Sequence, residues 1–327
     1  MLFKNKAVLV TGGAGFVGSN LAIRLVEEGA KVSVVDSFLS QCGANLFNLE
    51  PIINQIQLHK LDLRDPSGLT QLIEGQDYIF SMAGQVSHED SMSAPVEDLE
   101  INARSHLNIL EACRRSNKNA VILYASTRQI YGAPQYLPVD EKHPIRPADI
   151  NGINKYAAEQ YFSIYARVFG LKTVSLRLTN SYGPRQLIKH ARQGFIAWFM
   201  NRALTGQTIQ LFGGGTQLRD FNHIDDVSEA FVRAALSPSC FGKVYNLSGE
   251  RANLERIGNE LVALTGKGRV ERIEFPAERK KIDIGDYYGS SDLLTQDTGW
   301  VAKIGLSVGL KQTVEFYQRY GSHYLES

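Results

Sequence analysis

Short apolar segments alternate with amphipathic segments through the first 180 residues, and this alternation constrains the fold more than any other feature. The apolar segments are runs of strand length, such as AVLV at 7–10 and KVSVVD at 31–36. The segments between them repeat apolar residues every three or four positions, as in SNLAIRLVEEGA at 19–30, which is typical of helices. Continuously apolar strands belong to parallel sheets that helices cover on both faces. The sequence therefore predicts an α/β fold with a Rossmann-like, doubly wound parallel sheet.

The composition and pattern of the chain change after about residue 180. Gly, Arg and aromatic residues become more frequent there, and apolar and amphipathic segments alternate less regularly. A chain of 327 residues is also longer than one compact core usually reaches. We expect a first domain with the parallel sheet over 1–179 and a smaller α/β domain mainly over 180–327. Within the latter, HIDDVSEAFVRAAL and GKVYNLS have the pattern of a helix and a strand, so residues 218–248 are expected to return to the first domain.

Composition excludes several classes of function. The chain has 35 basic and 34 acidic residues, so no global charge attracts it to nucleic acid or to an anionic membrane. The three cysteines lack metal-ligand spacing, which predicts no metal site and favours a reducing cytoplasm. No apolar run reaches the length of about 18 residues that a membrane span requires, and the N-terminal run is too short for a signal peptide. We therefore expect a cytoplasmic protein with a small-molecule partner.

A glycine-rich turn, VTGGAGFVGSN, lies between the first predicted strand and the first predicted helix. Gly12, Gly15 and Gly18 have the spacing that permits a tight turn, close approach of a pyrophosphate and close packing of the helix on its strand. Phe16 and Val17 begin that helix, whose free N–H groups and positive dipole end would face the phosphates. The turn predicts a dinucleotide site, although glycines in a turn can also serve the turn alone.

Acidic and small residues at the next strand ends extend this prediction. Asp36, followed by Ser37, closes the second strand, where a carboxylate would accept hydrogen bonds from ribose hydroxyls and repel a 2′-phosphate, which favours NAD over NADP. Asp62 and Leu63 end the third strand, where they would hold the adenine edge unless Asp62 is a helix cap. SMAGQ at 81–85 places small residues beside the expected cofactor, namely Ala83 and Gly84.

These motifs, together with INARSHLNILEA, STRQIYG and NGINK, resemble the extended short-chain dehydrogenase/reductase family, the NAD-dependent nucleotide-sugar epimerases and dehydratases. RLTNSYGPR at 177–185 and LRDFNHIDDV at 218–227 look like the sugar-nucleotide half of that family. AGQVS, ARVFGL and PRQ look most similar to its CDP-tyvelose 2-epimerase branch, followed by the UDP-sugar 4-epimerases.

The resemblance implies NAD as cofactor, a nucleotide-diphosphate sugar as substrate and a homodimer through the helix that starts near residue 151. It implies that the cofactor contacts Gly12, Gly15, Phe16, Val17, Gly18, Asp36, Ser37, Asp62, Leu63, Ala83, Gly84, Asn102 and Lys155. It implies that Asn180, Arg185, Arg219 and Arg279 contact the substrate. For Arg219, a surface ion pair with Asp220 is the alternative.

The chain departs from the family at the residue that moves the proton. In the family, a tyrosine with a lysine four residues later accepts a hydroxyl proton while a hydride moves from the sugar to NAD. Here the tyrosine position holds Asn151, which cannot carry a proton away at neutral pH, whereas Lys155 is retained and should bind the nicotinamide ribose. A catalytic role for position 151 is therefore in question.

The two residues after Thr127 limit which reaction of the family this chain could catalyse. Thr127 falls where the family keeps a Ser or Thr that hydrogen-bonds the reacting sugar oxygen. The 4,6-dehydratases have Asp and Glu at the next two positions, but here these are Arg128 and Gln129, which cannot act as the acid and base of an elimination. The sequence therefore favours epimerisation, or a single oxidation or reduction, over dehydration.

Other groups could accept the proton in place of residue 151. His88 is the best candidate, because an imidazole ordinarily titrates near about pH 6.5, and Glu89 and Asp90 could tune it. The alternatives are Tyr131, which could instead be a packing aromatic, and a water held by Asn151 and Thr127.

A basic loop follows the YGP turn and contains Lys189, His190 and Arg192. It could close over a diphosphate or form a solvated face.

Three functional readings remain open at this stage. The first is an NAD-dependent nucleotide-sugar epimerase. The second is a catalytically silent NAD and nucleotide-sugar binder, and the third is a family enzyme whose tyrosine was exchanged deliberately for Asn151.

Overall fold

A parallel sheet forms the centre of the chain in the computed structural model, which describes residues 1–39, 42–190, 194–275 and 284–325. The seven strands lie in the order β10-β6-β5-β4-β1-β2-β3 and every neighbouring pair is parallel. Their bounds are β1 Ala7–Thr11, β2 Lys31–Asp36, β3 Ile56–Lys60, β4 Tyr78–Ser81, β5 Val121–Thr127, β6 Lys172–Leu178 and β10 Lys243–Asn246. The predicted Rossmann-like α/β fold is confirmed.

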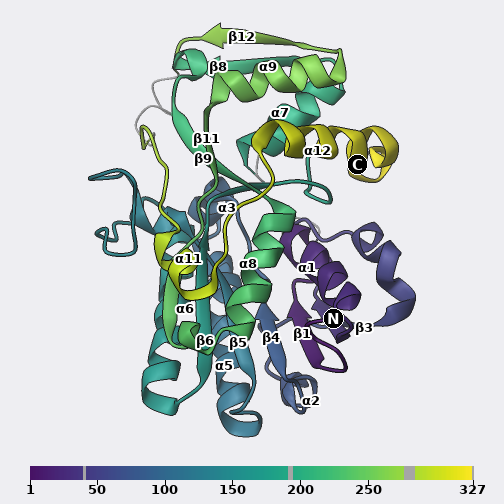
Figure 1. Cartoon of the computed structure of the whole chain (residues 1–327), viewed down its shortest axis with the longest axis vertical. Coiled ribbons are helices and arrows are strands. Elements are labelled where there is room, and N and C mark those ends of the chain that lie inside the picture. The colour runs from purple at the N-terminus through teal and green to yellow at the C-terminus, as the bar shows by residue number, and fades with distance from the viewer. Residues whose placement is uncertain (40–41, 191–193, 276–283, 326–327) are drawn as a thin grey trace.

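Helices cover both faces of this sheet (Figure 1). Along the connections between strands lie α1 Phe16–Glu27, η2 Leu46–Gln55, α2 Leu69–Ile73, α3 His88–Ser93, α4 Pro95–Leu99, the π-helical η3 Glu100–Arg104, α5 Ser105–Ser116, η4 Arg128–Tyr131, α6 Ile150–Phe169, α8 Ile224–Leu236 and η7 Pro238–Cys240. On β1, Val8 and Val10 join the apolar cluster under α1 and α8, whereas Leu9 joins the cluster under α5 and α6. This alternation follows from the two-residue period of a strand, so one apolar strand supplies two cores.

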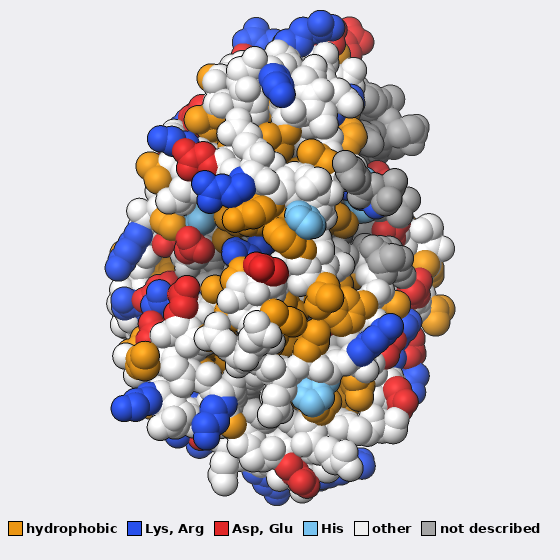
Figure 2. Space-filling view, turned by 90° about the vertical axis from the view of Figure 1, so that its right-hand side faces the viewer, with side chains coloured by type: hydrophobic (Ala, Val, Ile, Leu, Met, Phe, Trp, Pro, Cys, Tyr) orange, Lys and Arg blue, Asp and Glu red, His pale blue; other side chains and the backbone are white. Residues whose placement is uncertain are grey.

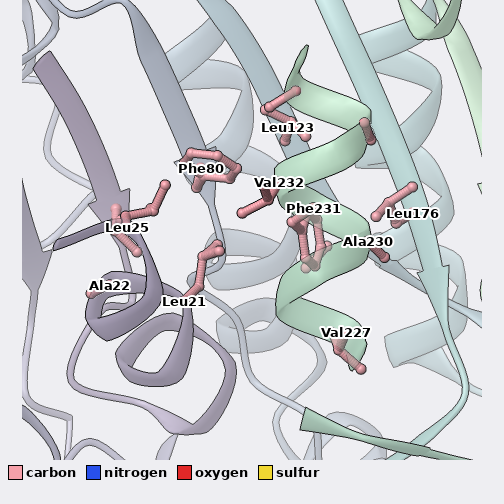
Figure 3. Packing of buried hydrophobic residues seen from close by; sticks show 14 of the residues in the cluster. Leu21, Ala22, Leu25, Phe80, Leu123, Leu176, Val227, Ala230, Phe231 and Val232 are labelled. Atoms are coloured by element: carbon pink, nitrogen blue, oxygen red, sulfur yellow. The ribbon is translucent and has the colours of Figure 1, made fainter. Parts of the chain in front are cut away.

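Figure 3 shows the packing under α1 and α8. Phe231 and Val232 of α8 lie against Phe80 of β4 and Leu123 of β5, and Leu21 and Leu25 of α1 approach from beside them. Phe231 is fully buried, so truncating it to alanine would cost about 3–5 kcal/mol of stability.

A smaller lobe packs above the carboxyl ends of the central strands (Figure 1). It contains a three-stranded sheet in the order β11-β9-β7 and a parallel pair of β12 and β8. Its strands are β7 Asn180–Tyr182, β8 Thr208–Phe212, β9 Leu218–His223, β11 Glu250–Asn253 and β12 Arg269–Ile273, and its helices are α7 Phe195–Leu204, η6 Gly213–Gly215, α9 Leu254–Thr265, α12 Leu306–Tyr320 and α13 Ser322–Leu325. A separate apolar cluster forms its core. Between the lobes, the chain returns through α8 and β10 to the central sheet and passes through α11 Asp292–Thr298.

The chain reverses its direction across the sheet next to β1. It runs from β1 to β2 and β3 on one side and then crosses to β4, β5 and β6 on the other. The carboxyl ends of β1 and β4 therefore border a crevice at the position where ligands bind in open parallel sheets.

The face seen in Figure 2 carries Lys and Arg interspersed with Asp and Glu rather than an area of one sign. Among the described residues, no helix has the length and apolar character that crossing a membrane would need.

Candidate active site

One cleft of about 1080 Å³ lies between the central sheet and the smaller lobe. The ends of β1, β2, β4 and β5 and the start of α6 form one wall, and β7, β9 and the start of α7 contribute to the other. Most residues predicted from the sequence line it, namely Gly12, Gly15, Phe16, Val17, Gly18, Asp36, Ser37, Asp62, Leu63, Ala83, Gly84, His88, Thr127, Asn151, Lys155, Asn180 and Arg219.

The glycine turn can accept a phosphate group because its residues lack side chains. Gly12 has a φ of +63°, and a Cβ there would lie 2.6 Å from the Cα of Ala83. A Cβ on Gly18 would collide with the carbonyl oxygen of Gly12. Gly15 caps α1 without a side-chain hydrogen bond, so the first N–H groups of the helix are left for a ligand in the cleft. This cradle fits the pyrophosphate of a dinucleotide.

Asp36 is held at the end of β2 by two backbone N–H groups. Its Oδ2 accepts a hydrogen bond from the backbone N–H of Ala14 at 3.0 Å, and its Oδ1 accepts one from Phe38 at 2.9 Å. Burial raises the pKa of Asp36, and these backbone N–H groups oppose that rise. Each oxygen keeps a further lone pair, so the carboxylate can still accept bonds from two ribose hydroxyls.

Asp62 lines the cleft, but its carboxylate is engaged by Arg64. The guanidinium Nη2 of Arg64 lies 2.6 Å from Oδ2 of Asp62, and the Arg64 backbone N–H donates to Oδ1 at 3.0 Å. The hydrogen bond from Arg64 lowers the pKa of Asp62. Asp62 is not a helix cap, because the next helix, α2, is capped by Gly68. Asp62 instead closes a local turn and holds Arg64 at the cleft wall, and its contact with adenine stays a prediction.

Gly84 lies close to the side chains of Asn102 and Lys155, at the nicotinamide end of the predicted cofactor site. A Cβ on Gly84 would lie 3.0 Å from Asn102 Oδ1 and 3.0 Å from Lys155 Nζ. Asn102 does not line the cleft; its side chain accepts a bond from the N–H of Gln85 and donates to the Gln85 carbonyl oxygen. Asn102 therefore shapes the loop after β4, and the direct cofactor contact predicted for it is not supported.

Lys155 lies almost fully buried at the floor of the cleft. Its Nζ donates to the carbonyl oxygen of Ala125 at 3.0 Å. Burial lowers the pKa of Lys155 to about 8, although the negative charge of Asp98 opposes this shift. The ammonium group is thus held by the end of β5 at the place where the sequence predicts a cofactor ribose.

Asn151 belongs to a buried network of amide groups around Asp98. Its Nδ2 lies 2.8 Å from the carbonyl oxygen of Gln85 and 3.1 Å from Asp98 Oδ2. Asn102 and Asn154 donate to the same carboxylate at 3.0 and 2.8 Å. Asp98 is 2% exposed, so the amide at position 151 helps to satisfy a buried carboxylate that would otherwise be costly. Position 151 has a structural role in this chain.

His88 is held from both sides of its ring. Nδ1 contacts Oδ2 of Asp149, while Gln129 Nε2 lies 2.6 Å from Nε2 of His88. A carboxylate accepts hydrogen bonds only, so Asp149 places the proton on Nδ1 and leaves the Nε2 lone pair as an acceptor. Burial raises the pKa of Asp149, but the hydrogen bond and charge of His88, the Gly152 N–H and the charge of Arg128 together lower it below its ordinary value. The carboxylate paired with His88 is therefore Asp149, which the sequence analysis did not single out, rather than Glu89 or Asp90.

Thr127 and Tyr131 have different positions despite their closeness in sequence. Thr127 lines the cleft, and its Oγ1 accepts a bond from the Gln129 N–H at 3.2 Å, which leaves its own proton to donate. Tyr131 is 1% exposed, donates to Asn246 at 2.7 Å and contacts the guanidinium of Arg177. Tyr131 is a core residue and is excluded as the proton acceptor.

The substrate half of the cleft contains two of the four residues predicted for it. Asn180 donates to the carbonyl oxygen of Asp220 at 2.9 Å, and Arg219 donates to the carbonyl oxygens of Leu218 and Gly285. Arg185 does not line the cleft; its guanidinium bonds Asn20 at 3.0 Å and lies over the ring of Phe316. A role for Arg185 in holding substrate is thus not supported.

The remaining predictions for this half concern two loops. Arg279 and Arg192 lie outside the described residues. Lys189 and His190 are described but do not line the cleft, and Nδ1 of His190 is buried and has no hydrogen-bond partner among the described residues.

Several cleft residues were missed by the sequence analysis. Asp149 caps α6, since its Oδ1 accepts a bond from Gly152 N–H at 2.7 Å, and an Asp before a helix start is a recognisable signal. Its contact with His88 spans 61 residues and has no local signal. Apolar rings also line the smaller-lobe wall, namely Phe195, Phe212 and Phe275. Over the described residues, no group of three or more His, Cys, Asp or Glu side chains could hold a metal ion.

Comparison with known proteins agrees with this geometry. Residues 8–248 match the model of the NAD dependent epimerase/dehydratase family. A UDP-glucose 4-epimerase of Mycolicibacterium smegmatis is 32% identical over 316 residues, which cover 95% of this chain and 98% of the relative. A CDP-paratose 2-epimerase of Salmonella typhi is 35% identical over 272 residues, covering 75% and 80%. The structure of a Thermotoga maritima UDP-glucose 4-epimerase with UDP-glucose is 30% identical, with a TM-score of 0.88 and coverage of 96% and 99%.

Proposed function

The chain belongs to the NAD dependent epimerase/dehydratase family, and we propose that it is a nucleotide-sugar epimerase whose proton acceptor is His88 in place of a tyrosine. The observation that carries this proposal is the His88–Asp149 pair, which lies on the same cleft as Thr127 and Lys155. Asp149 orients the ring and compensates the imidazolium charge that forms when Nε2 takes up a proton.

The cofactor would lie along the carboxyl ends of β1, β2 and β4. The glycine turn and the start of α1 would hold its pyrophosphate, Asp36 the adenosine ribose, and Lys155 the nicotinamide ribose. When bound, NAD supplies a reversible hydride acceptor, which allows a sugar carbon to be oxidised and then reduced from its other face.

The residues of this chain would handle the hydroxyl proton of that sugar carbon. A substrate hydroxyl that displaces the Gln129 amide from His88 would meet the free Nε2 lone pair. Thr127 Oγ1 would donate a hydrogen bond to the developing carbonyl oxygen. On the return step, His88 would give the proton back. Asn151 would take no part in proton transfer, because its amide is committed to Asp98 and Gln85.

Dehydration is the second reaction in the family's description, and the side chains after Thr127 argue against it. Gln129 contacts His88 through its amide, and Arg128 stacks on Tyr287 with its guanidinium 4.7 Å from the ring centroid. Neither side chain is an acid at neutral pH, so an elimination would lack the group that protonates the leaving hydroxyl.

For the substrate, we propose a nucleoside diphosphate sugar that spans the cleft toward the smaller lobe. The Thermotoga relative was solved with UDP-glucose. Arg219 and Asn180, which line the cleft, would contact the substrate's diphosphate, for which the planar guanidinium is suited. Phe212 and Phe275, with ring centroids 5.8 Å apart, provide apolar faces for a nucleobase.

We also propose that two copies of the chain associate through α6. Ile153, Ile164 and Val168 are exposed on this helix, and their spacings of 11 and 4 residues place them on one face. Val96 and Leu99 are also exposed, on α4, which packs against α6. An apolar stripe of this kind is suited to a symmetric helix–helix interface.

A panel experiment tests the enzyme proposal. The purified protein would be incubated with UDP-, CDP-, GDP- and dTDP-sugars, and epimers would be followed by NMR while the absorbance of bound NADH is recorded. We expect a product without added reductant, and we expect His88→Ala to abolish it. Tight binding of nucleotide sugars without turnover across the panel would instead indicate a catalytically silent binding protein. Full turnover by His88→Ala would show that His88 is not the proton acceptor.

A further inference from the structure

Arg128 places a cation in the chemical half of the cleft, and among the described residues it has no ion-pair partner. It follows Thr127 directly at the end of β5, lines the cleft and is half-buried. Across residues 1–39, 42–190, 194–275 and 284–325, no carboxylate lies within ion-pair distance of its guanidinium. Its guanidinium lies over the ring of Tyr287, which is 1% exposed and therefore a fixed support. The guanidinium is braced from one side and keeps its hydrogen-bond donors available.

Two acidic groups, Asp149 and Asp220, interact electrostatically with Arg128, but among the described residues neither forms an ion pair with it. Asp149 uses Oδ1 for the Gly152 N–H and Oδ2 for His88. Asp220 is fully buried outside the cleft lining and accepts a bond from the Gly289 N–H through Oδ2. Both carboxylates soften the positive potential at Arg128, but neither supplies the two-oxygen face that a guanidinium binds best.

A neutral sugar would leave this guanidinium without a partner when the substrate displaces water from the cleft, and an unpaired buried charge is costly. A carboxylate on the sugar would accept two parallel N–H bonds in the plane of the guanidinium. The diphosphate does not require Arg128, because Arg219 and Asn180 line the other wall of the cleft for that purpose.

We propose that the substrate is a nucleotide sugar whose sugar ring carries a carboxylate, of the hexuronic acid class, and that Arg128 braced on Tyr287 binds that carboxylate. This inference rests on the proposed function, because it assigns the substrate class of the same cleft.

Binding measurements test it separately from turnover. The NAD-loaded protein would be titrated calorimetrically with matched pairs that differ only in the carboxylate, UDP-glucose against UDP-glucuronate and the corresponding pairs of the other nucleotides. We expect the hexuronate to bind about 10- to 100-fold more tightly than the hexose, as charge-assisted hydrogen bonds allow. Arg128→Gln should abolish this preference, and Arg128→Lys should restore only part of it.

Arg251→Gln is the matched control, because Arg251 also stacks on a tyrosine, Tyr288, at 3.9 Å but is exposed and does not line the cleft. It should keep the preference of the unmodified protein. Equal affinity for hexose and hexuronate in the unmodified protein would overturn the proposal. Equal weakening of both ligands by Arg128→Gln would also overturn it, by assigning Arg128 to the diphosphate. Hexuronate preference without epimerisation would defeat the proposed function and leave this inference standing.

Discussion

Asp149 both begins α6 and orients His88, and a single substitution separates these two tasks. In Asp149→Asn, the side-chain oxygen can still accept the Gly152 N–H bond that caps the helix. The amide nitrogen would then face Nδ1 of His88, where it donates instead of accepting. The imidazole must respond by carrying its proton on Nε2, so the nitrogen that faces the cleft can no longer take up a proton.

The expected magnitudes for stability and catalysis differ widely. Asn and Asp cap helices almost equally well, and the pair with His88 is weak because 52% of the His88 side chain is exposed. We therefore expect Asp149→Asn to change the free energy of unfolding by less than about 0.5 kcal/mol. Loss of the proton acceptor should lower kcat by about 10²- to 10⁴-fold. Asp149→Ala, which also removes the cap, should cost about 0.5–2 kcal/mol in addition.

The measurements are urea unfolding, the epimerisation rate on the best substrate of the panel, and ¹⁵N NMR of the imidazole nitrogens. The NMR signal should move from the Nδ1–H to the Nε2–H tautomer in Asp149→Asn, and this readout does not depend on turnover. Wild-type kcat in a variant that shows the changed tautomer would refute the proton role of His88. An unchanged tautomer would refute the orienting role of Asp149.

Three further predictions concern other parts of the cleft. The pKa of Lys155 is lowered from 10.5 to about 8, so between these pH values the unfolded chain binds a proton that the folded chain does not. The free energy of unfolding should therefore increase with rising pH, by up to about 3 kcal/mol. The difference in this free energy between wild type and Lys155→Met should rise from pH 8 to 10, and a flat difference would contradict this. Asn151→Tyr removes a donor from buried Asp98 and should cost about 1–3 kcal/mol of stability while the Kd for NAD stays within about threefold; lost NAD binding would show that the cofactor site is misplaced. Asp36→Asn should weaken NAD binding about tenfold and reduce the discrimination against NADP, as measured by fluorescence titration. Unchanged selectivity would show that Asp36 does not contact the ribose.

The sequence predicted the central sheet because its signals are local. Continuous apolar strands, amphipathic helices and the glycines between β1 and α1 each report on a few neighbouring residues. The predicted helix and strand near the end of 218–248 are present as α8 and β10, and β10 pairs with β6 in the central sheet. These features could be read without knowledge of distant contacts.

The parts of the site that depend on long-range contacts could not be read in this way. Arg185 follows a YGP turn that looks like a ligand loop, yet its φ of 72° and its bond to Asn20 turn it away from the cleft. Asp62 had two plausible local roles, and the pairing with Arg64 was a third. Asn151 looked like a missing catalytic group, because the buried carboxylate of Asp98 that it serves lies 53 residues away.

The path of the backbone between the lobes limits how the cleft can exchange its contents. The backbone passes from one lobe to the other between β6 and β7, between β9 and α8, and between β10 and β11, and α11 lies on a further crossing. Several chain connections side by side resist a hinge motion between the lobes that a single linker would permit. Reactant and product should therefore enter and leave by rearrangement of surface loops while the two bodies keep their mutual orientation. A dinucleotide bound at the carboxyl ends of the central strands would then stay bound over many turnovers and be regenerated without leaving the protein.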